Sequence, residues 1–210
     1  YHETGHALVA VFTPGSDPVH KISIIPRGMG ALGYTLQRSQ DESFLKNYDE
    51  LLGEVDVLLG GRAAEQIALG QISTGASNDI SRATDVIKSM ICNYGMSEKF
   101  KNMTLGKRGG YAGGEPELVR EFSEETQKYI DDEIARMMAV EYDKVLKLLK
   151  IHKGLLESIT QKLLEKEIME GDEFQEMVKA EKPVKKNSGT AKKSTVAKKS
   201  TGKKKTTDKK

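Results

Sequence analysis

The chain has 210 residues, of which 37% are hydrophobic and 30% are charged, a composition typical of a soluble, helix-rich domain with one core. No apolar run approaches the roughly 20 residues that a membrane-spanning helix needs, and a single cysteine excludes an internal disulfide. The net charge of +2 hides a division, because residues 181–210 hold 12 lysines against two acidic residues, and the first 180 residues therefore carry −8.

The first predicted elements are one helix and two strands. HETGHALVAVF (2–12) is predicted to be a helix, which the prolines and glycine that follow it end. VHKISII (19–25) is rich in β-branched residues, and ALGYTLQ (31–37) alternates apolar and polar positions, so each is predicted to be a strand. The two strands together predict a small β-hairpin.

Helical spacing of apolar residues predicts that the rest of the body is mainly α-helical. The predicted helices cover residues 43–69, a segment that starts near Asn78, residues 116 to about 153, residues 155–169 and residues 174–178. GKRGGYAGGEPE (106–117) is predicted to be a flexible connection, because it lacks the GxxxxGK[ST] pattern of a phosphate-binding loop.

The lysine-rich segment 181–210 forms a separate region. It consists mainly of Lys, Ser, Thr, Ala and Gly with no aromatic residue, so it cannot bury a core and is predicted to be disordered. The predicted organisation is therefore a mainly α domain with a small hairpin over residues 1–180, followed by a disordered basic tail over 181–210.

The pattern HExxH at the start of the chain predicts a metal site. On a helix, His2 and His6 lie on one face and can bind one Zn²⁺, while Glu3 lies beside the first ligand. A carboxylate in that position can take the proton of a water molecule that zinc acidifies, which is the chemistry of metal-assisted peptide hydrolysis. The alternative is a chance pair of surface histidines, but the helix continues into apolar residues, and buried polar groups need partners.

A catalytic zinc needs a third protein ligand, and the residues alone leave two candidates open. Asp79 shares an apolar helical face with Ala83 and Val86, where a carboxylate is unfavourable unless a cation meets it. The alternative role for Asp79 is to cap its helix. Glu65 could be the ligand instead, or it could pair with Arg62 or hold a ligand histidine.

Several long blocks of the sequence resemble the protease domain of the FtsH family. The blocks are YHETGHALVA, VHKISIIPRGMGALGYTLQ, LLGGRAAEQIALGQISTGASNDISRATDVIKSMICNYGMSEKF and LLEKEIMEGDEF, and the resemblance runs from residue 1 to about 178. It implies a helical zinc-protease domain in which His2, His6 and Asp79 bind Zn²⁺ and Glu3 is the general base. Glu65 then supports a ligand. Thr4 and Tyr94 depart from the family pattern, but neither is a proposed ligand.

The resemblance also implies a larger protein. FtsH proteins are membrane-anchored AAA+ proteases, so the chain is expected to be a C-terminal piece that begins within the active-site helix. Transmembrane segments and the ATPase domain that binds ATP would lie upstream. The implied partners are polypeptide substrates and other subunits of a homo-hexamer, with the protease domain on the cytoplasmic side of the inner membrane.

Two other functions are weighed against the protease. A catalytically silent subunit used for structure or oligomerisation is opposed by the intact HExxH motif and Asp79. The basic tail could bind an anionic surface, but it has no interleaved aromatic residue, so no specific nucleic acid is expected. Two further roles stay open: residues 22–25 or 32–36 as an edge that pairs with substrate, and residues 60–64 as a contact between subunits or within the chain.

Overall fold

The structure is a computed structural model that describes residues 1–26, 33–37, 45–105, 107–108, 118–119 and 122–181. The predicted disordered tail therefore lies outside the described residues from residue 182 on. The turn predicted after Pro26 and most of the glycine-rich connection at 106–117 also lie outside them.

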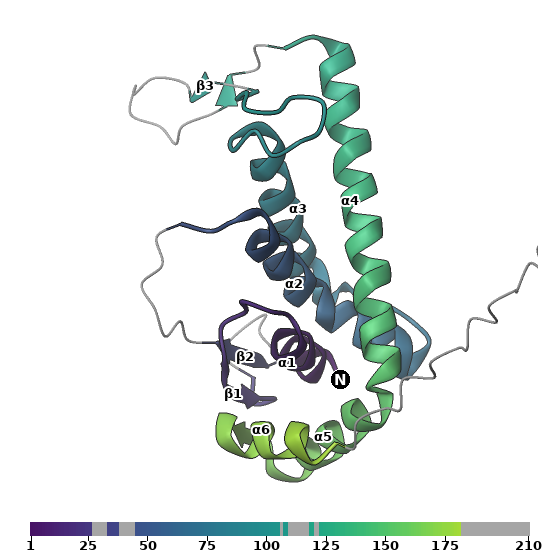
Figure 1. The fold of residues 1–210 in the computed structure, drawn as a ribbon. Helices are drawn as coiled ribbons and strands as arrows, with labels where there is room; N and C mark the ends of the chain where they lie inside the picture. The colour runs from purple at the N-terminus through teal and green to yellow at the C-terminus, as the bar shows by residue number, and fades with distance from the viewer. Residues whose placement is uncertain (27–32, 38–44, 106, 109–117, 120–121, 182–210) are drawn as a thin grey trace, which may run out of the picture.

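Helices dominate the described residues, and a small antiparallel sheet accompanies them, which confirms the predicted fold class (Figure 1). The helices are α1 (His2–Phe12), α2 (Tyr48–Leu69), α3 (Ser77–Cys92), α4 (Glu124–Ile151), α5 (Lys153–Lys166) and α6 (Gly171–Ala180), with a 3-10 turn η1 (Thr74–Ala76) before α3. The strands are β1 (Val19–Ser23), β2 (Tyr34–Gln37), β3 (Lys107–Arg108), β4 (Leu118–Val119) and β5 (Ile168–Glu170).

The predicted hairpin is confirmed, but it is part of a three-stranded sheet with the order β2-β1-β5. In the register of this sheet, Ile22 of β1 lies opposite Thr35 of β2 and Met169 of β5. The prediction that a helix continues from 155 to 169 was wrong. Glu167 adopts a left-handed conformation with φ 63° at the end of α5, and the next three residues pair with β1 instead.

The start of α2 is fixed by local hydrogen bonds. The Asn47 side chain accepts a hydrogen bond from the Glu50 backbone N–H, and the Glu50 carboxylate accepts one from the Asn47 N–H. This capping box places the first turn at Tyr48, five residues later than the predicted start. Of the predicted extra residues, 43 and 44 lie outside the described part of the chain.

Helix α1 is held in the core between α2 on one side and α5 on the other. Gly5 and Gly60 lie back to back, so a Cβ atom on Gly60 would come within 2.8 Å of the Gly5 carbonyl oxygen. Gly60, Gly61 and Ala64 therefore pack within the chain, against α1. On the other side, Thr160 donates a hydrogen bond to Thr4 at 3.2 Å. These contacts fix the helix that carries the HExxH motif.

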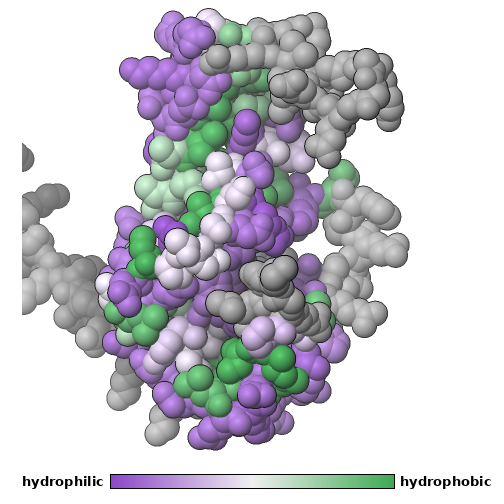
Figure 2. All heavy atoms as spheres, turned by 180° about the vertical axis from the view of Figure 1, so that it is seen from behind, coloured by the Kyte–Doolittle hydropathy of each residue, from purple (hydrophilic) through white to green (hydrophobic). Residues whose placement is uncertain are grey.

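Among the coloured residues of the face that Figure 2 shows, no continuous apolar belt is visible. Hydrophilic residues cover most of this face, and hydrophobic residues form separate patches among them. Among the described residues, no helix combines the length and the apolar character that crossing a membrane requires.

Candidate metal centre

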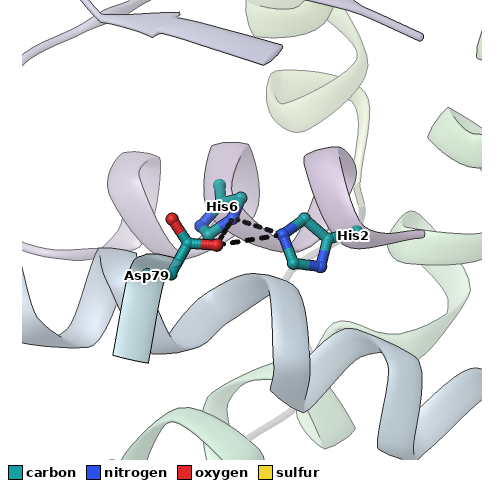
Figure 3. Close-up of side chains that lie close together, drawn as sticks. All are labelled: His2, His6 and Asp79. Atoms are coloured by element: carbon teal, nitrogen blue, oxygen red, sulfur yellow. Dashed lines mark hydrogen bonds and ion pairs between the residues drawn. The ribbon is translucent and has the colours of Figure 1, made fainter. Parts of the chain in front are cut away.

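The structure brings together the three side chains that the sequence predicted as metal ligands. His2 and His6 project from successive turns of α1, and Asp79 projects toward them from the first turn of α3 (Figure 3). The two Nε2 atoms lie 3.0 Å apart, and Asp79 Oδ2 lies 3.2 Å from Nε2 of His2 and 3.5 Å from Nε2 of His6. These three residues form the group of possible metal ligands within the described part of the chain.

The other nitrogen of each imidazole is occupied by an acceptor on α2. His6 Nδ1 lies 2.7 Å from the Val57 carbonyl oxygen, and His2 Nδ1 lies 2.9 Å from Glu65 Oε1. Because a carbonyl and a carboxylate can only accept, both Nδ1 atoms must carry the proton. The lone pairs of both Nε2 atoms therefore point into the same space as the Asp79 carboxylate, which is the tautomer that a metal needs.

The spacing of these three atoms fits one tetrahedral ion. Atoms that bind Zn²⁺ at about 2.0–2.1 Å in a tetrahedron lie roughly 3.3 Å from one another. The observed separations of 3.0, 3.2 and 3.5 Å bracket this value. Three acceptors that face one another repel unless a cation or a proton lies between them, so the donor set fits a metal of zinc's size and ligand preference.

The electrostatics of the chain without metal show the same need for positive charge. Burial disfavours protonation of His2, but hydrogen bonds to Asp79 and Glu65 outweigh it and raise the pKa of His2. Burial also disfavours ionisation of Asp79, yet the hydrogen bonds with His2 and His6 hold its pKa well below the usual range. Asp79 is therefore ionised at neutral pH and available to a cation.

Glu65 lies behind His2 and also holds the loop that leads to Asp79. Its Oε2 accepts a hydrogen bond from the Ser73 backbone N–H at 2.9 Å, and its Oε1 accepts one from the Ser73 hydroxyl at 3.1 Å. Burial opposes ionisation, but the hydrogen bonds with His2 and Ser73 lower the pKa of Glu65. In this geometry Glu65 contacts Nδ1 of His2 from behind, whereas the Asp79 carboxylate lies on the side of the two Nε2 atoms.

Glu3 lies beside the two histidines and is oriented by β2. The Thr35 hydroxyl lies 2.9 Å from Glu3 Oε2 and 3.0 Å from the Glu3 carbonyl oxygen. Gly33 gives the side chain room, because a Cβ atom there would come within 3.0 Å of Glu3 Cγ. One carboxylate oxygen is thus held by Thr35 while Glu3 lines the same cleft as the two histidines.

A cleft of about 760 Å³ opens over this group, between α1, β2, α2 and the start of α3. Two cations line it. Lys46 forms an ion pair with Glu54 at 2.7 Å, whereas Arg82, one turn after Asp79 on α3, is exposed and has no ion pair with any described residue. The cleft thus combines a group of possible metal ligands, the Glu3 carboxylate and one exposed cationic side chain.

Sequence reasoning missed the contributions of Val57 and Thr35. The backbone carbonyl of Val57 leaves no trace in residue type, and a threonine on a strand has many possible roles. One feature of the sequence could have pointed to the contact between α2 and the histidines. Positions 57, 61 and 65 are spaced by four and therefore lie on one side of the helix.

Comparisons with known proteins find a family model and relatives that cover most of the chain. Residues 1–177 match the family model for Peptidase family M41. The chain is 47% identical over 184 residues to the ATP-dependent zinc metalloprotease FtsH of Clostridium perfringens, covering 87% of this chain and 25% of that protein. It is 41% identical over 183 residues to the protein of that name from Thermotoga maritima, covering 86% and 30%. The chain thus spans between a quarter and a third of the length of these curated relatives.

Proposed function

The chain belongs to peptidase family M41, and from this membership we propose that it is a zinc-dependent endopeptidase domain. His2, His6 and Asp79 hold the metal, and Glu3 is the general base. The observation that carries the proposal is the convergence of two Nε2 lone pairs and one carboxylate oxygen within 3.5 Å of one another. The name of these relatives, ATP-dependent zinc metalloprotease, supports zinc as the ion.

The residues of the chain divide the chemistry among them. When bound, zinc polarises a peptide carbonyl and acidifies a water molecule. Glu3 takes the proton of that water at a carboxylate oxygen and returns it to the nitrogen of the leaving amine. Thr35 keeps Glu3 turned into the cleft through its 2.9 Å hydrogen bond, and Val57 and Glu65 keep both imidazoles in the tautomer that leaves Nε2 free.

The substrate is proposed to be an extended polypeptide along β2. Of the two strands predicted as substrate edges, β1 is paired on both sides, whereas β2 pairs with a strand on one side among the described residues. Backbone pairing along β2 would accept many sequences, and β2 also carries Thr35, which contacts Glu3. Arg82 of α3 lines the same cleft, and its proposed role is to bind a carbonyl oxygen or a carboxylate of the substrate.

The wider setting is also proposed from the relatives. These relatives are named as ATP-dependent enzymes, and this chain covers 25% and 30% of their lengths, so ATP hydrolysis would reside in other parts of the full protein. A homo-hexamer anchored in the inner membrane, with this domain on the cytoplasmic side, follows the family resemblance. A catalytically silent subunit is less well supported, because a silent subunit has no need for a complete donor set.

Zinc content and hydrolysis of an unfolded polypeptide test the proposal together. The purified parent chain is expected to hold one zinc per chain after dialysis. Asp79→Ala should lose it, and Asp85→Ala, which changes an exposed aspartate of the same helix, should keep it. Glu65→Ala should weaken zinc binding by about 10–100-fold without moving the ligand set. A folded parent that binds no zinc would refute the assignment, and loss only in Glu65→Ala would transfer the third ligand to Glu65.

A further inference from the structure

One line of residues on α2 faces both imidazoles. Val57, Gly61 and Glu65 are spaced by four, so they lie one above another on the same side of the helix. The Val57 carbonyl oxygen contacts His6 Nδ1, and the Glu65 carboxylate contacts His2 Nδ1. Gly61 lies between these two acceptors, and its neighbour across the interface is the His2 ring.

Gly61 leaves space that the His2 ring fills. A Cβ atom on Gly61 would lie 2.5 Å from Cε1, 2.6 Å from Nε2 and 2.7 Å from Nδ1 of His2, and these are its three nearest atoms. Ordinary van der Waals contact begins near 3.4 Å, so a methyl group there would have to displace the ring by about 0.9 Å. A metal–ligand bond tolerates deviations of only about 0.2 Å.

Gly60 differs from Gly61 in what it touches. The nearest atoms to a Cβ on Gly60 all belong to the backbone of Gly5 and His6, so Gly60 allows the two helices to approach. The nearest atoms to a Cβ on Gly61 all belong to one side chain, that of a proposed ligand. The two adjacent glycines therefore have separable roles, one in helix packing and one at the metal.

We propose that Gly61 is a positioning residue for the metal: its missing side chain makes a seat on α2 in which His2 is held with Nε2 aimed at the ion. The proposal rests on the proposed function, because it concerns the same metal centre. Glu65 fixes the ring through Nδ1, and Gly61 permits the ring to lie close to the helix axis, so the two residues act together. Binding of zinc then requires little rearrangement of His2.

Metal affinity and stability of the metal-free chain separate this role from ordinary packing. In Gly61→Ala the dissociation constant for Zn²⁺, measured by competition with a chromogenic chelator, is expected to rise about 10–100-fold. The unfolding temperature of the metal-free chain should not fall, because alanine favours a helix over glycine and a displaced ring can move into the cleft. Gly154→Ala is the matched control, since a Cβ there meets no atom within 4 Å, and its zinc affinity should equal that of the parent.

A double variant keeps the test decisive if Gly61→Ala unfolds easily. If the methyl group clashes only with the imidazole, His2→Ala should restore the unfolding temperature of the Gly61→Ala chain to that of His2→Ala alone. If Gly61→Ala lowers the unfolding temperature of the His2→Ala chain as much as it lowers that of the parent, the proposal is overturned. The added methyl group would then clash with a group other than the His2 ring.

The affinity measurement has its own contrary outcomes. Parent-like zinc affinity in Gly61→Ala, or an equal loss in Gly154→Ala, would overturn the proposal while the proposed function stands. A parent chain that binds no zinc refutes the proposed function itself, and the role of Gly61 falls with it.

Discussion

The stability of the domain should depend on pH through a buried group at the interface of α2 and α4. Asp56 of α2 and Glu141 of α4 are 1% and 7% exposed, and Lys144 forms ion pairs with both carboxylates. Asp56 Oδ1 has no hydrogen-bond partner among the described residues. Two buried carboxylates thus share one ammonium group, and burial, reinforced by Glu141, raises the pKa of Asp56 to about 7.

The size of the effect follows from this pKa. Asp56 titrates near 3.8 when exposed and near 7 in the folded chain, and a difference of about 3 units corresponds to about 4 kcal/mol. Asp56 holds its proton more tightly in the folded chain than in the unfolded chain. Protonation of Asp56 therefore contributes its full share to the free energy of unfolding below about pH 4, and this contribution is lost as the pH rises through 7. Lys144, whose pKa its two carboxylate partners raise despite burial, stays charged throughout this range.

Asp56→Asn should remove this pH dependence. Asparagine resembles the protonated acid, so the variant and the parent should differ little near pH 4. The free energy of unfolding of the variant, relative to the parent, should then rise by roughly 2 to 3 kcal/mol between pH 5 and pH 8. Urea unfolding at four pH values measures this difference, with a chelator present so that zinc does not contribute.

An exposed aspartate of α4 supplies the control for Asp56→Asn. Asp132→Asn should show no such trend, because Asp132 lies on the surface. If the free energies of unfolding of the parent and Asp56→Asn changed with pH in parallel, the reasoning would be refuted.

Three further outcomes are expected. Glu3→Gln should bind zinc as the parent does but lose at least about 100-fold in kcat, because the amide cannot take a proton; a parent-like rate would remove Glu3 from the chemistry. Arg82→Gln should raise KM for peptide hydrolysis with zinc content unchanged, and an unchanged KM would leave Arg82 without a role in binding. Phe174→Ala should lower the free energy of unfolding in urea by about 3–5 kcal/mol, because Phe174 is fully buried against the sheet side of the core; a loss below 1 kcal/mol would contradict its place in the core.

Local signals accounted for most of the fold. Prolines and glycines bounded α1, and helical spacing of apolar residues located α2, α3, α4 and α5, because these features act within one or two turns of the chain. β5 could not be predicted in this way. Ile168 and Met169 continue the apolar spacing of α5, no glycine marks the left-handed residue at Glu167, and the strand exists because β1 pairs with it from about 146 residues away.

Part of the candidate metal centre could be predicted from the sequence, again because it depends on local spacing. The spacing of His2 and His6 on one helix is local, so HExxH predicted their convergence. The choice between Asp79 and Glu65 was not local, because it depends on how residues 70–76 fold back. The hydrogen bonds between Glu65 and Ser73 fix that loop and place Asp79, rather than Glu65, opposite the two Nε2 atoms. The roles of these residues stay predictions until zinc content is measured.

The hydrogen bonds between α1 and α5 also bear on the order in which the candidate metal centre can form during synthesis. Tyr1 and Thr4 contact Glu157 and Thr160, 156 positions further along the chain. At roughly 5–20 residues per second, a ribosome needs about 8 to 30 s to make the intervening segment. Throughout that time the helix that carries His2 and His6 lacks its contacts with α5, although α2 and the Asp79 segment are already made. The contacts that hold α1 from the α5 side can therefore form only after α2, α3 and α4 have been synthesised.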